Sequence, residues 1–205
     1  MTGNKKAALE ASAIRDLVFA KEPDTVIPRD NSYILSYRHL RDCVAQRQGN
    51  LTPTDFVCIT HMVYGWMPTV LESHLDQKNA SFANGALLLD RARLDGTLPD
   101  SDIEQLRAII NNSLVGTSKV LHFVAPDHFP IWDSKIYSFL HRNTSQPKPY
   151  HSRVNQILHY RSYISILKAI KSDKRFRPFH SSVNRRLEYE VSALRAIELI
   201  MFLNA

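Results

Sequence analysis

The stretch that decides the fold runs from Asn112 to Leu140 and reads Asn-Ser-Leu-Val-Gly-Thr-Ser-Lys-Val-Leu-His-Phe-Val-Ala-Pro-Asp-His-Phe-Pro-Ile-Trp-Asp-Ser-Lys-Ile-Tyr-Ser-Phe-Leu. An amphipathic segment over residues 103–110 precedes it. Gly116 follows that segment and can supply the positive φ that a tight turn needs. The pattern therefore predicts two helices joined by a hairpin.

The second half of the stretch predicts a short helix and then an acid at the start of another. Thr117 or Ser118 can cap a helix over 119–124, and Pro126 ends it. Asp133 stands where the next helix begins, with its carboxylate over unpaired backbone N–H groups. A hairpin that presents backbone amides can bind phosphate groups. Followed by such an acid, it is the arrangement expected of a protein that acts on a phosphate backbone.

Helical periodicity runs through the rest of the chain, and no strand pattern or internal repeat is visible. At 205 residues, with 44% hydrophobic and 22% charged residues, the chain can form one domain or two tightly joined lobes. The fold class is therefore predicted to be all-α. The expected helices cover, to within a few residues, about 5–21, 32–48, 53–63, 77–93, 99–110, 134–140, 152–171 and 183–203.

The two cysteines, Cys43 and Cys58, bear on cofactors and compartment. Two thiolates cannot hold a four-cysteine iron–sulfur cluster, so no such cluster is expected. We expect free, buried thiols in a reducing cytoplasm. No apolar run reaches the length of a membrane span, and the N-terminal residues lack the apolar core of a signal peptide. The expected location is cytoplasmic, without membrane contact.

Positive charge is concentrated in one region. The chain carries a net charge of +6, and the segment from Ser134 to Leu187 holds twelve Lys or Arg but one acid, Asp173. This asymmetry favours a polyanionic partner, although a solvated helical surface without a partner is the alternative. The basic residues of the segment are Lys135, Arg142, Lys148, Arg153, Arg161, Lys168, Lys171, Lys174, Arg175, Arg177, Arg185 and Arg186.

The hairpin and the acid together resemble the helix-hairpin-helix DNA glycosylase superfamily. The resemblance is carried by Val115-Gly116, Lys119, Leu121 and the run Phe129-Pro130-Ile131-Trp132-Asp133-Ser134-Lys135-Ile136. That superfamily has a Val-Gly turn, an apolar helix, and then Pro-Val-Asp or a close variant before a further helix. Its essential carboxylate falls on Asp133. One departure is that Leu114 stands where the first hairpin glycine usually is.

The resemblance implies a two-lobed helical fold with a cleft between the lobes. Residues 26–133 would form a six-helix lobe ending in the helix-hairpin-helix element, and 1–25 plus 134–205 a second lobe with a basic face. The implied activity is that of a DNA glycosylase, which flips a base of double-stranded DNA into the cleft and hydrolyses its N-glycosidic bond to leave an abasic site.

Asp133 is the expected catalytic residue. Loss of the base builds positive charge on the deoxyribose, and a carboxylate in a dry cleft stabilises that charge and can orient water towards C1′. The structural alternative is a plain N-cap for the following helix.

Lys119 is the second catalytic candidate, as an imine-forming lysine. In bifunctional members the lysine lies two residues after the second hairpin glycine, which here is Ser118. An offset of one residue rotates a helical side chain by about 100°. We therefore expect Lys119 to contact phosphate or lie on the helix surface, and expect a glycosylase that does not cleave the strand.

Other residues are assigned by the resemblance or by composition. Backbone groups of Leu114 to Ser118 would bind phosphate, and a monovalent cation at the hairpin is compatible with this; an ordinary αα-turn is the alternative. No pair of histidines has a metal-binding spacing. Expected DNA contacts are Leu114, Val115, Gly116, Thr117, Ser118, Lys119, Lys135, Arg142, Lys174, Arg175 and Arg177. The expected base pocket or wedge residues are Tyr64, Trp66, Met67, His122 and Trp132, with core packing as the alternative.

Three functions remain open on the sequence. The first is a monomeric DNA glycosylase acting on oxidised or alkylated bases, or on hypermodified bases of phage DNA. The second is a non-catalytic helix-hairpin-helix DNA-binding module in which Asp133 only caps a helix. The third is a helical interaction protein whose basic face meets an acidic protein or RNA.

Overall fold

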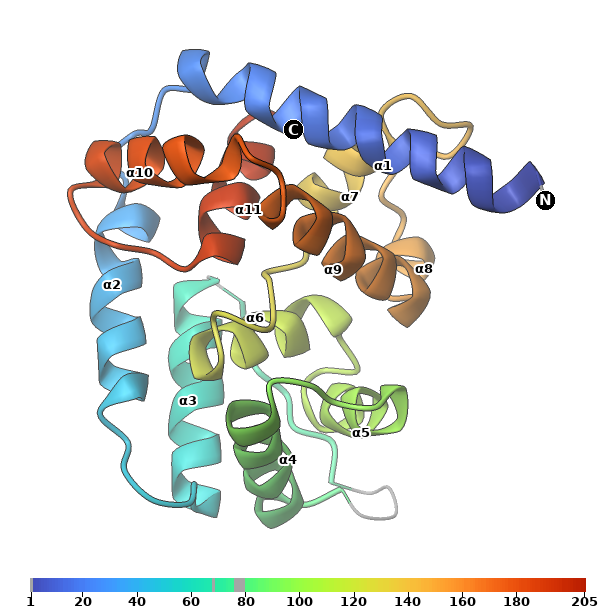
Figure 1. Ribbon diagram of the computed structural model, residues 1–205. Coiled ribbons are helices and arrows are strands. Elements are labelled where there is room, and N and C mark those ends of the chain that lie inside the picture. The colour runs from blue at the N-terminus through green and yellow to red at the C-terminus, as the bar shows by residue number, and fades with distance from the viewer. Residues whose placement is uncertain (1, 68, 76–79) are drawn as a thin grey trace. The chain divides into compact units, whose positions relative to one another are not determined.

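A computed structural model of the chain describes residues 2–67, 69–75 and 80–205, with only the backbone of residues 2–10. Every regular element in this part of the chain is a helix (Figure 1), and one isolated bridge joins Ser73 to Ile110. The predicted all-α class is confirmed. Among the described helices, none combines the length and the apolar character that crossing a bilayer requires.

The chain divides into two compact units. One contains residues 28–132, and the other contains residues 1–27 together with 133–205. Each unit is described by itself below.

The unit over 28–132 is built from five α-helices whose caps are encoded locally. Asn31, Thr52, Ser81 and Ser113 each accept a backbone N–H at a helix start, as short polar residues do at N-caps. Its core lies where the third helix of the chain packs against the fourth and sixth. The helices are α2 (Ser32–Ala45), α3 (Pro53–Trp66), α4 (Phe82–Asp95), α5 (Asp100–Ile109) and α6 (Leu114–Val124).

The other unit is organised around its last helix, α11 (Ala193–Leu203), of which residues 193–201 are all buried. This helix packs against α1, α7, α9 and α10. The remaining elements are α1 (Thr2–Lys21), the 3₁₀ turn η1 (Glu22–Asp24), α7 (Ser134–His141), α8 (His151–Val154), α9 (Ile157–Lys171) and α10 (Phe176–Leu187).

The two long C-terminal helices expected from periodicity are each interrupted. The segment 152–171 breaks at residues 155–156, and 183–203 breaks at 188–192. Glu188 ends α10 in the left-handed region with φ 64°. The loop that follows is held because the Asn184 side chain accepts the Val191 N–H at 3.1 Å, and His180 Nε2 lies 2.8 Å from the Val191 carbonyl oxygen. These contacts between side chain and backbone interrupt the helix, although apolar residues continue at helical spacing through the segment.

One smaller expectation was wrong. Cys43 and Cys58 are free but exposed rather than buried, because each lies on the outer face of its helix. Of the three consecutive leucines of α4, Leu88 and Leu89 are buried and Leu87 is 56% exposed. That helix begins after Ser81, and Gln77, its expected start, lies outside the described residues.

Candidate functional site

The turn between α5 and α6 lies earlier than expected. Asn111 and Asn112 take the left-handed conformation, with φ 53° and 47°, and α6 already begins at Leu114. Ser113 caps α6 by accepting the Gly116 N–H at 3.1 Å. Positive φ at Gly116, and a cap at Thr117 or Ser118, were therefore wrong expectations. Asparagine adopts this conformation more readily than most residues, so the pair can form the turn without glycine.

Gly116 has a packing role instead. A Cβ atom built at this position would collide with the hydroxyl and ring of Tyr64 on α3. The absent side chain thus lets α6 approach α3 closely. Burial raises the pKa of Tyr64 to about 12, against the opposite effect of its hydrogen bond with Ser113.

The turn is tied to the segment 70–74. The Asn111 N–H donates to the Glu72 carbonyl oxygen at 3.1 Å, and its side-chain amide donates to the Val70 carbonyl oxygen at 2.9 Å. The Asn111 side-chain oxygen in turn accepts the Glu72 N–H. The backbone N–H groups of Gly116 and Thr117 likewise form hydrogen bonds within the chain, both to Ser113. Binding of phosphate by the backbone of Leu114, Val115 and the rest of the hairpin stays a prediction.

Ser118 connects α6 to the peptide that precedes Asp133. Its side chain is fully buried, and its hydroxyl accepts the Trp132 N–H at 3.1 Å. The same hydroxyl lies 3.2 Å from the Trp132 carbonyl oxygen and 2.9 Å from that of Val115. The side chain of Ser118 thus holds the backbone of Trp132, and the DNA contact expected of its backbone stays a prediction.

Asp133 caps α7 with one carboxylate oxygen. Its backbone is extended, Oδ1 accepts the Ile136 N–H at 2.9 Å, and its carbonyl oxygen accepts the Tyr137 N–H at 2.9 Å. The side chain is half-buried, and within the described residues no hydrogen bond is made to Oδ2. One oxygen thus fixes the carboxylate while the other can still accept a hydrogen bond.

Polar groups that the sequence analysis missed lie near this carboxylate in the same unit. Tyr163 on α9 is fully buried, and its pKa is raised well above the ordinary value, first by burial and then by the carboxylates of Glu198 and Asp133. Glu198 forms an ion pair with Arg195 inside α11, where both side chains are buried. The sequence signal was an Arg and a Glu three residues apart in an otherwise apolar helix.

Three of the expected base-contacting residues line the end of α3. Trp66 packs edge-on against Phe123, with ring centroids 5.3 Å apart, and its indole N–H donates to the Tyr33 carbonyl oxygen at 3.2 Å. Tyr64 is 2% exposed, and Met67 is half-buried at the C-cap. Tyr64 and most of the Trp66 ring therefore pack within the protein, which is the alternative to contact with a base.

His122 and Trp132 are core residues. His122 Nδ1 lies 2.8 Å from the Phe129 carbonyl oxygen, which can only accept, so this nitrogen donates. Its Nε2 lies 2.7 Å from the Tyr37 hydroxyl. Both His122 and Trp132 have no exposed surface, so neither is presented to stack on a base.

The candidate cations differ in what they contact. Lys119 lies 5.9 Å above the Trp66 ring, and Lys135 lies 4.3 Å above the Phe202 ring. Arg142 donates to the carbonyl oxygens of Phe139 and Asn204, and burial lowers its pKa. Its guanidinium thus stabilises the end of α7.

Arg175, another expected DNA contact, pairs with both Asp16 and Asp173. Lys174 and Arg177 are exposed, and no ion pair to either is found within the described part of the chain. The expected DNA-binding cations therefore separate into structural and available groups.

A cavity of about 380 Å³ lies in the unit that contains Asp133, between α1, α7 and α9. His141 and His159 line it, and His141 stacks on Tyr137 with ring centroids 4.2 Å apart. Burial, and then the charge of Arg153, lowers the pKa of His159. Asp133 does not line this cavity.

Across the described ranges, no group of three or more His, Cys, Asp or Glu side chains is placed to hold a metal ion. Comparison of the chain with protein-family models, curated proteins and solved structures found no match.

Proposed function

We propose that this protein is a DNA glycosylase that extrudes a damaged or modified base and hydrolyses its N-glycosidic bond, with Asp133 as the essential carboxylate. The observation that carries the proposal is the way Asp133 is held. Ser118 bonds the peptide before it, the Ile136 N–H fixes Oδ1, and Oδ2 keeps its capacity to accept. Catalytic groups need this kind of support from rigid elements.

The reaction follows from the charge of the ionised carboxylate. As the C1′–N bond breaks, its electron pair leaves with the base, and positive charge develops on the deoxyribose. A fixed negative charge nearby stabilises that state. Water then adds to C1′ while donating a hydrogen bond to Asp133, and the proton that this water loses is taken up by the departing base, which leaves a neutral base and an abasic site. This hydrolysis requires no lysine.

The basic segment supports duplex DNA as the substrate. Twelve Lys or Arg lie between Ser134 and Leu187, in the same compact unit as Asp133. Such a field attracts the phosphate backbone without reading its sequence. The base excised would be oxidised, alkylated or a hypermodified base of phage DNA, and double-stranded DNA would be bound by a monomer in the cytoplasm.

The decisive experiment compares the wild type with Asp133→Asn on a panel of duplexes carrying oxidised, alkylated, deaminated or glucosylated bases. Asparagine caps helices about as well as aspartate, so the variant keeps the fold but loses the charge. We expect wild-type abasic sites, detected by alkaline strand cleavage, and at least a hundredfold lower rate in the variant, the scale of a lost electrostatic contact. Equal rates for both proteins would refute a catalytic Asp133.

A second function is favoured by the cap itself. Because Asp133 Oδ1 bonds the Ile136 N–H, its presence is also accounted for by helix stability alone. In that case the protein is a non-catalytic helix-hairpin-helix DNA-binding module. Duplex binding by the wild type, without abasic sites on any modified duplex, would establish this alternative.

A further inference from the structure

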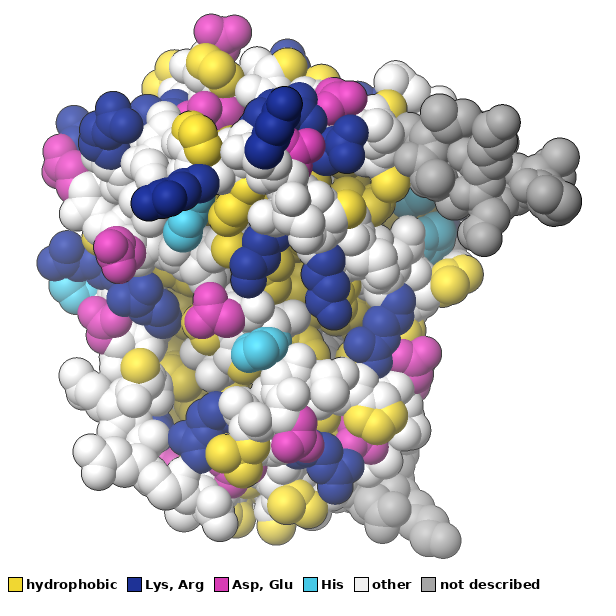
Figure 2. Space-filling model, in the orientation of Figure 1, with side chains coloured by type: hydrophobic (Ala, Val, Ile, Leu, Met, Phe, Trp, Pro, Cys, Tyr) yellow, Lys and Arg dark blue, Asp and Glu magenta, His cyan; other side chains and the backbone are white. Residues whose placement is uncertain are grey.

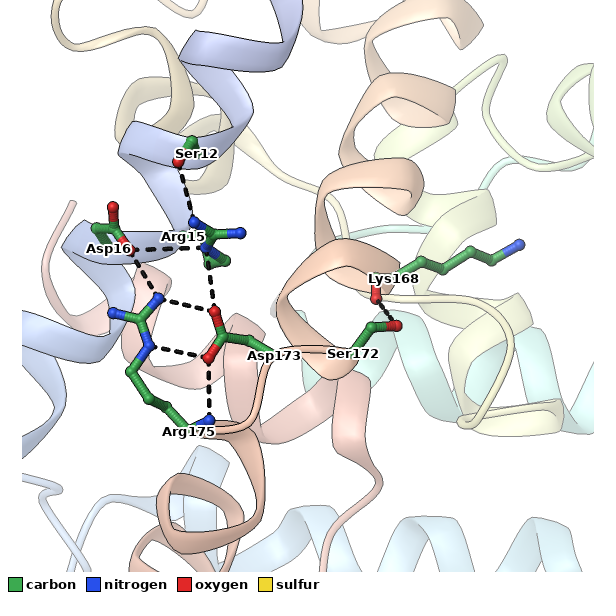
Figure 3. Close-up of polar contacts among 7 residues, drawn as sticks. All are labelled: Ser12, Arg15, Asp16, Lys168, Ser172, Asp173 and Arg175. Carbon is green, nitrogen blue, oxygen red and sulfur yellow. Dashed lines mark hydrogen bonds and ion pairs between the residues drawn. The ribbon is translucent and has the colours of Figure 1, made fainter.

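Four exposed cations follow one another from the end of α9 to the start of α10: Lys168, Lys171, Lys174 and Arg177. We call them the phosphate ridge. In the part of the chain that the structure describes, no carboxylate lies within ion-pair distance of any of the four. In Figure 3 the Lys168 side chain extends away from the nearby acidic residues.

This lack of partners is not general in the protein. Several arginines elsewhere are paired with carboxylates of their own unit, as in the pairs Arg91–Asp102, Arg93–Asp90 and Arg107–Glu104. A surface kept soluble by mixed charges has this interspersed pattern. The phosphate ridge departs from it.

Asp16 and Asp173, which lie beside Arg175, are already paired with arginines. Asp173 lies 3.3 Å from Arg15 and 2.8 Å from Arg175, and Asp16 lies 2.7 Å from Arg175 (Figure 3). The Arg175 side chain, through its hydrogen bonds, holds the pKa of Asp173 well below its ordinary value. Two arginines thus offset two aspartates, so the four ridge cations remain uncompensated.

The surface beside the ridge is open and holds small side chains. A shallow hollow of about 630 Å³ is lined by Ala169 and Ser172, with Lys174, Arg15, Asp173 and Arg175 also at its edge. The Ser172 hydroxyl donates to the Lys168 carbonyl oxygen, which leaves its lone pairs at the surface. Figure 2 shows Lys and Arg side chains spread over the region where Figure 1 draws α9 and α10.

We infer that the phosphate ridge binds the sugar-phosphate backbone of duplex DNA, and that Arg175, although adjacent in sequence, stabilises the fold instead. Lysine and arginine groups without internal partners can release condensed counterions from DNA when they bind, whereas a guanidinium shared by two carboxylates cannot do so without losing both pairs. The choice of duplex DNA as the polyanion rests on the proposed function.

The test measures binding of undamaged duplex DNA over a series of salt concentrations by fluorescence anisotropy. Each phosphate contact contributes about 0.9 to the slope of log Kd against log salt. We expect Lys174→Gln to lower that slope by about 0.9, and the combined variant Lys168→Gln, Lys171→Gln, Lys174→Gln, Arg177→Gln to lower it by about 3.6. All four side chains are exposed, so the variants should keep the wild-type melting temperature.

Two matched control variants show whether a change in slope comes from lost contacts between the phosphate ridge and DNA or from the loss of one positive charge anywhere on the protein. Arg175→Gln, one residue away, should leave the slope unchanged and lower the melting temperature. Arg38→Gln removes an exposed cation of α2 and should change neither quantity. The inference is overturned if the combined variant keeps the wild-type slope, if all three single variants lower it equally, or if duplex RNA binds more tightly than duplex DNA.

The inference and the proposed function can fail separately. Asp133→Asn should keep the wild-type salt slope whether or not the protein is an enzyme. A ridge-dependent slope without abasic-site formation would retain the inference and remove the glycosylase. Abasic-site formation with a salt slope that does not depend on the ridge would retain the glycosylase and remove the inference.

Discussion

The hydroxyl of Ser118 lies 3.1 Å from the backbone nitrogen of Trp132 and 3.2 Å from its carbonyl oxygen, so both backbone polar groups of this residue contact a single side chain of α6. The next residue is Asp133. The contact therefore fixes the last residue before Asp133 in the sequence. A small polar residue at position 118 is what makes this connection possible.

Ser118→Ala should destabilise the fold and misplace Asp133. Removing the hydroxyl leaves the buried Trp132 N–H without its acceptor, which costs about 1–3 kcal/mol of unfolding free energy. Urea titration measures this loss. If the protein is a glycosylase, kcat should fall with little change in KM, since a positioning defect acts on the reaction step.

Ser165→Ala is the matched control, because its hydroxyl donates only to a carbonyl oxygen one turn back on the exposed side of α9. We expect a change within about 0.5 kcal/mol. Equal stability of both variants would show that the contact between Ser118 and Trp132 does not hold the segment.

Gly116→Ala should destabilise the unit over 28–132 through Tyr64. The added methyl group meets the Tyr64 hydroxyl, and overpacking of this kind costs about 1–3 kcal/mol. Tyr64→Phe removes the hydroxyl, which is the nearest of the colliding atoms, and so relieves part of the overlap. The double variant should therefore be more stable than the sum of the two single losses predicts, with a coupling of at least about 0.5 kcal/mol by denaturant titration. Strict additivity would mean that the close approach is not what requires glycine.

The sequence predicted the helices where one local rule decided the outcome. Thr52-Pro53 begins α3, and Asp133 caps α7, because caps and proline act over three or four residues. It placed the α5–α6 turn wrongly because the consecutive asparagines Asn111 and Asn112 take the conformation expected of Gly116. The resemblance places the turn at Gly116. In the structure the turn depends on hydrogen bonds between Asn111 and the segment 70–74, about forty positions earlier.

Of the candidate site, the sequence predicted the position of the carboxylate at the start of α7, and its catalytic role stays a proposal. The resemblance identified Asp133, but which cations are available depends on pairs between distant residues, such as Arg175 with Asp16. A count of charges along the chain cannot reveal that neutralisation. Likewise, Tyr163 and Glu198 come together where α9 and α11 pack, and helical periodicity alone does not predict that the two residues are neighbours.

Glu198→Gln should be among the most destabilising single changes in the protein. It leaves the Arg195 guanidinium buried in α11 opposite a neutral amide, and breaking a buried pair from one side costs about 3–5 kcal/mol. Replacing both residues, with Arg195→Met and Glu198→Leu, removes both charges and should recover most of that loss. Thermal and urea unfolding would test this. A double variant as unstable as Glu198→Gln would show that the pair stabilises the helix beyond compensating its own charges.

Acid should weaken the attachment of α1 through Asp173 and Asp16. Hydrogen bonds from the Arg175 side chain are the largest cause that lowers the pKa of both aspartates in the folded protein. A carboxyl group whose folded pKa is depressed stabilises the fold above its unfolded pKa, and this stabilisation is lost as the pH falls towards the folded value. The melting-temperature difference between the wild type and Asp173→Asn should therefore be largest near neutral pH and shrink below about pH 4.

Salt provides the control for that pH series. Because these groups lie near the surface, 1 M salt should reduce the same difference at neutral pH by screening. A difference that stays constant from pH 7 to pH 2.5 would mean that Asp173 stabilises the fold through contacts that do not depend on its charge.

Lys119→Gln should preserve abasic-site formation. The ammonium group of Lys119 lies over the Trp66 ring, and Ser118, not Lys119, occupies the position two residues after Gly116. An imine mechanism needs an uncharged lysine at the C1′ atom, whereas hydrolysis assisted by Asp133 needs only water. We therefore expect no covalent adduct when borohydride is added to the wild type with any duplex on which it forms abasic sites, and a rate in Lys119→Gln within about tenfold of wild type, since only a phosphate or surface contact is lost. An adduct that forms in the wild type and disappears in Lys119→Gln would instead make this residue the nucleophile, and strand cleavage would then have to accompany base loss.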